Sequence, residues 1–315
     1  MEQDYKKKYI RDIKPLVLKD RPFIDKILLK TDTSLSAYTF VTHYIWKDHF
    51  QYYWRIIDGY LCLFAEYDNC IYMPIPPVLC QANQSENTRD FQKIISMVFS
   101  IMNRHNNNKT ISRIENIDEH QKGLFLSNRY EVKTGETEYL YLREDLINLK
   151  GDPYKSKRAM YNYFIKNYSF NYEPFHKSFT VECIKLYEAW KIKRSNKFID
   201  PFYHALLEDS YSAHRRAIKH FSSLKLSGRV VRINDKVEGY IFGFGRGNVS
   251  YVLLEVTNPD IKGLSQFIFR EFCREMEGYT FINTLGDSGL ENLRNVKLSY
   301  RPFKLIPSYS AYENA

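Results

Sequence analysis

Cysteine, tryptophan and long apolar runs are scarce in this chain of 315 residues, which has 5 Cys and 3 Trp. The cysteines are odd in number and form no CxxC pair, which disfavours a disulfide framework or a zinc knuckle and indicates a reducing cytosol. No apolar run approaches the ~18 residues that a membrane-spanning helix needs. The N-terminus, with Lys6 to Lys8, lacks the apolar core of a signal peptide. We therefore expect a cytoplasmic protein without a transmembrane segment.

Several catalytic and metal-binding motifs are also missing. The 8 His show neither HxxxH nor HxH spacing, so we predict no metal site. The Gly-x-Ser-x-Gly elbow of many hydrolases is absent as well. What the chain does have is positive charge: Lys and Arg number 46 against 37 Asp and Glu, a net charge of +9. Such an excess favours anionic partners, RNA or acidic lipid headgroups, without choosing between them.

The length fits two domains of ordinary size, and a hydrophobic content of 44% suffices for packed cores. In the first half, three short aromatic and β-branched runs are separated by Asp58-Gly59 and Asp68-Asn69, which are turn sequences of an antiparallel meander. The runs cover residues 52–58, 60–66 and 70–75. An amphipathic helix is predicted for residues 87–105, and further strands for residues 111–115, 129–133 and 138–142.

The second half repeats this logic. Helices are predicted for residues 154–167, 179–194, 202–220 and 263–276, and strands for residues 225–233, 236–244, 250–256 and 279–283. Each half then reads as an α+β domain with a mixed, mostly antiparallel sheet flanked by helices. This is the element order of the acetyltransferase-like (GNAT) fold, so we predict two tandem GNAT-like domains, residues 1–145 and 146–315.

A series of short motifs marks the second half. They are Lys155-Ser-Lys157-Arg158, Glu208-Asp209, Leu254-Glu255, Gly263-Leu-Ser-Gln266, Asn283, Asp287-Ser-Gly289, Leu293-Arg294 and Lys297-Leu-Ser-Tyr300-Arg-Pro302. In this order they resemble the C-terminal domain of the bacterial phosphatidylglycerol lysyltransferases and, more closely, small uncharacterised soluble proteins related to it. The resemblance covers about residues 140–312 and is most specific at its end. It departs from the family pattern at Val256 and Thr284, where Lys and Arg are usual, and at Asn292, where Gly is usual.

The resemblance implies an aminoacyltransferase-like protein that moves an aminoacyl group from aminoacyl-tRNA to an amine or hydroxyl acceptor, phosphatidylglycerol being one candidate. It implies three catalytic residues: Glu255, Asp287 and Tyr300. The implied substrate-binding residues are Glu208, Gln266, Asn283, Arg294, Lys297 and Ser299. The implied RNA-binding residues are Lys155, Lys157 and Arg158, and two further basic clusters, at residues 191–197 and 214–220, are alternatives.

Aminoacyl transfer needs a stabilised oxyanion and a group that holds the free amino group of the donor. A carboxylate suits the second task, and Asp287 or Glu255 is the candidate. Arg294 or Lys297 could hold an acceptor phosphate, and Tyr300 could donate to the oxyanion or relay a proton. Structural roles stay open beside these: Asp287 as a helix cap, Glu255 as a surface residue and Tyr300 as part of the core.

Two other functions stay open. One is an acyl-CoA-dependent N-acyltransferase, although the segment that would cradle the pyrophosphate, residues 260–265, has one glycine, Gly263, where two are favoured. Coenzyme A is therefore the less favoured co-substrate, and no cofactor is predicted. The other is a degenerate GNAT pair that only binds RNA or a protein. This alternative is supported by Val256 and Thr284, which replace the usual Lys and Arg. A lipid acceptor would place the protein at the membrane periphery.

Overall fold

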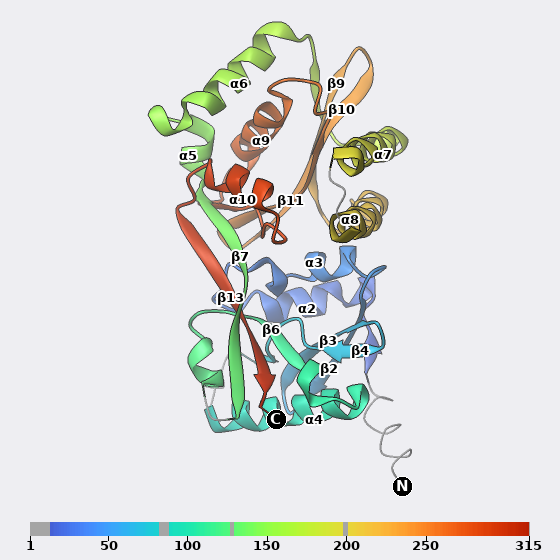
Figure 1. Ribbon diagram of the computed structural model, residues 1–315, viewed down its shortest axis with the longest axis vertical. Coiled ribbons are helices and arrows are strands. Elements are labelled where there is room, and N and C mark those ends of the chain that lie inside the picture. Colours follow the sequence, from blue (N-terminus) through green and yellow to red (C-terminus); the bar gives the residue numbers. More distant parts are fainter. Residues whose placement is uncertain (1–12, 82–87, 127–128, 198–200, 315) are drawn as a thin grey trace. The chain divides into compact units, whose positions relative to one another are not determined.

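The computed structural model describes residues 13–81, 88–126, 129–197 and 201–314 (Figure 1). The N-terminal segment with Lys6 to Lys8, for which no signal peptide was predicted, lies outside the described residues. The chain forms two compact units: the first unit contains Met1–Thr137 and Ile306–Ala315, and the second unit contains Glu138–Leu305. This division differs from the contiguous domains expected from the sequence. The reason is that two strands, β7 (Tyr130–Leu142) and β13 (Lys304–Glu313), each run through the boundary.

The first unit begins with a short strand and two helices, continues with a meander, and adds a long helix and more strands. Its elements besides β7 and β13 are β1 (Lys14–Pro15), α2 (Arg21–Leu28), α3 (Phe40–Ile45), β2 (Gln51–Ile57), β3 (Tyr60–Tyr67), β4 (Cys70–Tyr72), β5 (Val78–Leu79), α4 (Thr88–Asn106) and β6 (Arg113–Ile117). One face of α4 packs Phe91, Ile95 and Val98 into the core of this unit, as its predicted apolar stripe requires. The first residue of the predicted helix, residue 87, lies outside the described part.

The predicted meander is confirmed. β2 pairs antiparallel with β3, and β3 pairs antiparallel with β4. Asp58 and Gly59 have φ of 45° and 85°, and Asp68 and Asn69 have φ of 50° and 59°. Two successive left-handed residues give a turn whose twist matches that of the paired strands.

β7 is one strand of 13 residues where the sequence predicted two. The two predicted strands were separated by a polar stretch around Gly135. In the structure this glycine lies in the strand, and a Cβ there would stand 2.9 Å from Ser308 Oγ of β13. The glycine therefore permits the close approach of β13, which also pairs antiparallel with β6.

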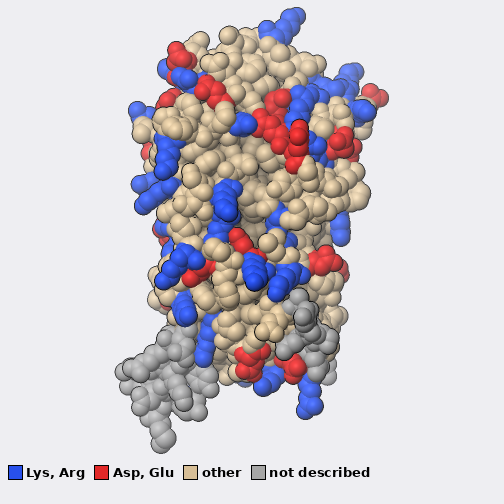
Figure 2. Space-filling model, turned by 180° about the vertical axis from the view of Figure 1, so that it is seen from behind, with Lys and Arg blue, Asp and Glu red and all other residues tan. Residues whose placement is uncertain are grey.

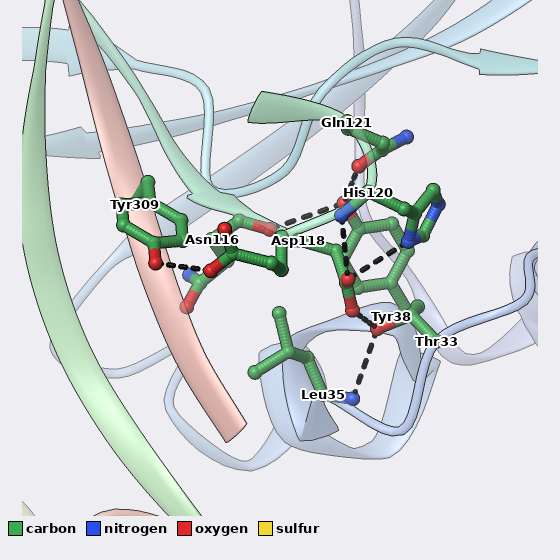
Figure 3. Close-up of polar contacts among 9 residues, drawn as sticks. Thr33, Leu35, Tyr38, Asn116, Asp118, His120, Gln121 and Tyr309 are labelled. Carbon is green, nitrogen blue, oxygen red and sulfur yellow. Dashed lines mark hydrogen bonds and ion pairs between the residues drawn. The ribbon is translucent and has the colours of Figure 1, made fainter. Parts of the chain in front are cut away.

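Polar side chains fasten the loop that follows β6 in the first unit (Figure 3). Asp118 accepts hydrogen bonds from Thr33 Oγ1 and from His120 Nδ1, the second at 2.8 Å. Tyr309 of β13 donates to the Glu119 carboxylate in the same loop. These contacts tie segments that lie far apart in the sequence.

The second unit contains the end of β7, the start of β13 and a series of α-helices and strands. They are α5 (Arg143–Asn148), α6 (Lys155–Asn167), β8 (Asn171–Pro174), α7 (Thr180–Lys197), α8 (Pro201–Lys219), β9 (Ser227–Ile233), β10 (Lys236–Arg246), β11 (Val249–Thr257), α9 (Leu264–Glu275), β12 (Phe281–Asn283) and α10 (Glu291–Leu298). The strand order is β7-β12-β11-β10-β9-β8, in which β12 joins β11 in parallel and β7 pairs antiparallel with β12.

Helices cover both faces of this sheet (Figure 1). On β10, Ile241 belongs to the core that α6 and α9 share. Its neighbour Tyr240 points to the opposite face, where its hydroxyl lies 2.7 Å from His214 Nδ1 of α8. The alternation of side chains along a strand thus assigns α6 and α9 to one face and α8 to the other.

α9 begins unusually close to α6. Gly263 precedes the helix with a left-handed φ of 86°, and a Cβ on it would stand 2.2 Å from the carbonyl oxygen of Met160. Only glycine fits such a contact without displacing α6. Gly263, the one glycine of the segment that would have to cradle a pyrophosphate, therefore serves helix packing.

The two units share one order of elements. Apart from the 3-10 helices and the two-residue strand β5, the first unit runs β1-α2-α3-β2-β3-β4-α4-β6, and the second unit, after α5 and α6, runs β8-α7-α8-β9-β10-β11-α9-β12. In each, a short strand and two helices precede a meander, a helix and a further strand. The predicted α+β class with two GNAT-like domains is confirmed.

Candidate functional site

The loop between β12 and α10, residues 284–290, forms the centre of the candidate site in the second unit. Leu285, Ser288 and Gly289 have left-handed φ of 62°, 53° and 73°. For a residue with a Cβ this conformation costs roughly 1–2 kcal/mol. Such a loop is maintained only where its surroundings hold it, and this is typical of functional sites.

Asp287 anchors this loop and is only 4% exposed. Its carboxylate accepts hydrogen bonds from the Tyr139 hydroxyl, from Arg294 Nε at 3.0 Å and from the Gly289 N–H at 3.0 Å. Burial acts to raise the pKa of Asp287, but the hydrogen bonds, that of Arg294 above all, hold the pKa below its usual value. The residue that caps α10 is Leu290, so Asp287 is not the cap of this helix.

Lys297 holds the loop from α10. Its ammonium group donates to the carbonyl oxygens of Thr284 and Leu285, the second at 3.1 Å. The carbonyl oxygen of Lys297 accepts a hydrogen bond from the Tyr141 hydroxyl at 2.9 Å. Arg294 shares this helix, as predicted, but its side chain is 53% exposed. The two cations therefore differ: Lys297 is committed to the loop, and Arg294 is accessible to an anion.

Glu255 lies on β11 just after a break in the strand pairing. The register between β10 and β11 shifts at Phe242 and Gly243, and Glu255 then stands opposite Ile241. Burial raises the pKa of Glu255 to about 7, and the positive charge of Lys297 acts in the opposite direction. A carboxyl group with a pKa near neutrality can take up a proton at physiological pH, as a general base must.

Tyr300 follows α10 and is 9% exposed. Its ring packs edge-on against Phe269 at 5.0 Å between centroids, and Lys157 Nζ lies 4.2 Å from the ring centroid. Burial raises the pKa of Tyr300 far above its usual value, and the charge of Glu255 raises it further. The hydroxyl therefore stays protonated and can donate a hydrogen bond but cannot act as a base. Tyr300 therefore belongs both to the core and to the candidate site.

Two predicted substrate-binding residues support the backbone of this region. Asn283 is fully buried and donates to Glu138 Oε2 at 2.7 Å, while its side-chain oxygen accepts from the Leu285 N–H at 2.7 Å. Ser299 Oγ donates to the Val296 carbonyl at 2.5 Å, which closes the last turn of α10. Both contacts fix the loop and helix that carry the other candidates.

The remaining two substrate-binding candidates are Glu208 and Gln266. Glu208 of α8 forms an ion pair with Lys191 Nζ at 2.7 Å, and 65% of its side chain is exposed. Because α8 covers the sheet face opposite Tyr300, the structure does not bring Glu208 to the candidate site. Gln266 lies half-buried in the first turn of α9.

The three predicted RNA-binding residues at the start of α6 have different surroundings. Lys155 is exposed. Lys157 is half-buried beside the ring of Tyr300, and burial lowers the pKa of Lys157. Arg158 donates to the carbonyl oxygens of Leu149 and Gly151, the second at 2.6 Å. Arg158 therefore fastens the end of α5, and Lys157 belongs with the candidate site.

In each of the two alternative basic clusters, one member is either neutral or ion-paired. His214 is buried against Tyr240, and burial lowers the pKa of His214 to about 3, so the ring is neutral at pH 7. Lys193 forms an ion pair with Asp260. On the face drawn in Figure 2, Lys and Arg are interspersed with Asp and Glu.

Three residues of β7 were missed as parts of this site. Glu138, Tyr139 and Tyr141 hold Asn283, Asp287 and the end of α10 through the hydrogen bonds given above. From the sequence, residues 138–142 were expected to belong to the first domain. No local signal in the sequence shows that this strand pairs with β12.

The described residues contain neither a membrane-spanning helix nor a cluster of metal-ligand side chains. In that part of the chain no helix combines the length and apolarity needed to cross a membrane. Nor do His, Cys, Asp and Glu side chains gather there in threes as metal ligands would.

The shared order of elements in the two units defines a tandem GNAT-like protein. Its second unit carries the candidate site, which has a strained polar loop and a carboxyl group whose pKa lies near neutrality. The chain belongs to the family described as phosphatidylglycerol lysyltransferase, C-terminal, which it matches over residues 30–312. The match extends into the first half, beyond the motifs that carried the sequence resemblance.

Similar solved structures agree with this fold. A conserved protein of unknown function from Bacteroides thetaiotaomicron has a TM-score of 0.83 at 24% identity, over 96% of this chain and 99% of that one. A structure named as the C-terminal domain of a lysylphosphatidylglycerol synthetase from Agrobacterium fabrum has a TM-score of 0.64 at 12% identity, over 94% and 92%. L-PGS from Bacillus licheniformis has a TM-score of 0.59 at 16% identity, over 86% of both chains. Among curated proteins no match is found.

Proposed function

We propose that this protein transfers an aminoacyl group from aminoacyl-tRNA to an amine or hydroxyl acceptor. The family, which is named for a lysyltransferase, supports this class of reaction. The observation that carries the proposal is Glu255, a half-buried carboxyl group whose pKa is raised to about 7 by loss of solvation and which interacts electrostatically with Lys297 and Tyr300. This is the protonation behaviour that activation of an acceptor requires.

In the proposed reaction Glu255 is the general base. The acceptor O–H or N–H gives its proton to Glu255 while its oxygen or nitrogen attacks the ester carbonyl of the donor. The protonated Tyr300 hydroxyl donates a hydrogen bond to the oxygen that becomes negative. The ester bond to the ribose then breaks, and the ribose oxygen takes the proton that Glu255 accepted. No coenzyme A takes part, in keeping with the use of Gly263 for packing against α6.

The surroundings of Asp287 favour a positioning role. Its carboxylate already accepts three hydrogen bonds and is almost fully buried, so it is poorly placed to bind the amino group of a donor. Instead it orients Arg294, whose exposed guanidinium group suits a phosphate of the acceptor or of the tRNA.

The first test is the transfer of radiolabel from a mixed pool of charged tRNAs. Lipid-extractable and water-soluble products are counted separately, which reports the acceptor class. We expect label in one of these fractions, and an Arg294→Ala variant should reduce it by roughly 10–100-fold, the effect of losing charge-assisted hydrogen bonds to an anion. Arg89→Ala, which removes an exposed arginine of α4 in the first unit, is the matched control and should transfer as the wild type does.

Circular dichroism of each variant shows whether the fold is kept. If the wild type leaves every charged tRNA intact, the proposed reaction is wrong. If transfer occurs and Arg294→Ala equals Arg89→Ala, the reaction stands and the anion site lies elsewhere.

A further inference from the structure

Three polar side chains lie near one another at the candidate site and have no hydrogen-bond partner. Among the described residues, none forms a hydrogen bond or an ion pair with the Glu255 carboxylate, the Tyr300 hydroxyl or the Lys157 ammonium group. Lys157 Nζ lies 4.2 Å from the centroid of the Tyr300 ring, and the charge of Glu255 raises the pKa of Tyr300. Polar groups removed from water are normally hydrogen-bonded, so three unpaired ones mark the place of a polar ligand.

Hydrogen bonds fix the start of α6, which carries Lys157. Tyr154, the residue before this helix, donates its hydroxyl hydrogen bond to the carbonyl oxygen of Tyr300 at 3.2 Å. One turn further on, Arg158 donates to the carbonyl oxygen of Gly151 at 2.6 Å. The position of Lys157 beside the Tyr300 ring is therefore built into the fold and does not depend on a loose surface helix.

Lys157 has given up water without gaining an anion. It is half-buried, whereas Lys155 of the same helix is exposed, and loss of solvation lowers the pKa of Lys157. Contact with the face of an aromatic ring offsets part of this cost. No carboxylate of the described residues pairs with it, although a cation that leaves water normally has such a partner. The missing negative charge is therefore expected on the substrate.

We infer that Lys157 is a catalytic residue that binds the carbonyl oxygen of the aminoacyl ester, and not a residue that holds the RNA backbone. This rests on the proposed function. When the acceptor attacks the carbonyl carbon, an electron pair moves to the oxygen, which becomes negative. The Lys157 ammonium group over the Tyr300 ring and the hydroxyl at the ring edge both donate to this oxygen. The pair returns when the ester bond to the ribose breaks, and Lys157 keeps its proton throughout.

The first measurement compares the kinetics of transfer by Lys157→Met, which keeps an unbranched stem without the charge, with those of the wild type. We expect kcat to fall by roughly 10²–10³-fold, as for other donors to a developing oxyanion, and KM for charged tRNA to stay the same. Lys155→Met is the matched control and should keep both constants. Lys157→Arg restores the charge and should recover part of the lost rate. A lysine on the RNA backbone would instead raise KM and lower the salt slope of binding by about 1.

The second measurement needs no transfer. Adenosine 3′-esters of 1-aminoalkylphosphonic acids carry a negatively charged tetrahedral phosphorus where the donor has its carbonyl carbon. Calorimetry of the full chain with a set of these esters should show binding by the wild type and by Lys155→Met. Lys157→Met should bind them about 10–100-fold more weakly, because a charge-assisted hydrogen bond to the anion is lost. Circular dichroism checks the fold of each variant, and Lys157→Gln replaces Lys157→Met if the latter does not fold.

The two measurements separate the inference from the proposed function. If the wild type transfers no aminoacyl group but binds a phosphonate ester through Lys157, the proposed function is wrong and the anion-binding role of Lys157 stands. A Lys157→Met variant with the wild-type kcat would overturn the inference and leave the proposed function in place. A rise in KM shared with Lys155→Met would also overturn it, because both lysines would then hold RNA. So would a wild type that binds none of the esters.

Discussion

Replacing Gly263 with alanine is expected to lower the free energy of unfolding of the second unit by about 2–5 kcal/mol. Two costs add. The left-handed φ of 86° costs a residue with a Cβ roughly 1–2 kcal/mol. The new Cβ would also stand 2.2 Å from the carbonyl oxygen of Met160, and pushing α6 away from α9 costs about 1–3 kcal/mol. Urea unfolding followed by circular dichroism measures the sum.

The chain contains a control for the first of these costs. Gly278 has a φ of 84°, and nothing lies within 4 Å of the position that its Cβ would occupy. Gly278→Ala should therefore show the backbone cost alone, roughly 1–2 kcal/mol. Equal losses in the two variants would mean that α6 does not approach α9 as closely as described.

The elements with a strong local signal could be predicted from the sequence. The Asp58-Gly59 turn and the stripe of α4 each follow from a few neighbouring residues, and both form as predicted. The assignment of β7 and β13 to the units could not be predicted from the sequence, because it depends on pairing between residues that lie far apart in the sequence. Leu140 pairs with Asn283, and Tyr309 pairs with Ile117. A glycine such as Gly135 looks like a break until its partner strand is known.

The same limit applies to the site. The motif from Asn283 to Tyr300 supplied the loop, its anchor Asp287 and both cations of α10, since these residues are close in sequence. The tyrosines of β7 that hold this loop come from more than 140 residues upstream, and nothing in their sequence marks them. Burial was equally invisible, and it is burial that gives Glu255 its raised pKa.

Replacing Glu255 with glutamine is expected to slow transfer by roughly 10²–10⁴-fold, the usual contribution of a general base, without loss of the fold. The folded pKa of Glu255 is about 7, above its ordinary value of 4.5. Between these values the folded protein binds more protons than the unfolded chain, so the wild type loses stability as the pH rises through this range. Glutamine has no proton to lose. At about pH 8 the variant should therefore be more stable than the wild type, by up to about 3 kcal/mol, and below the ordinary pKa this advantage should vanish.

Transfer and stability measured across pH together separate a catalytic carboxyl group from a merely buried one. A general base must be deprotonated, so wild-type transfer should fall about tenfold per pH unit below the folded pKa of Glu255. Glu277→Gln, which removes an exposed carboxylate next to Gly278, should leave both profiles unchanged. If Glu255→Gln changes the stability profile but transfers at the wild-type rate, Glu255 is desolvated as described and another group accepts the proton. Should neither profile change, the carboxyl group does not sit in the low-dielectric setting that raises its pKa, and the proposed mechanism loses its base.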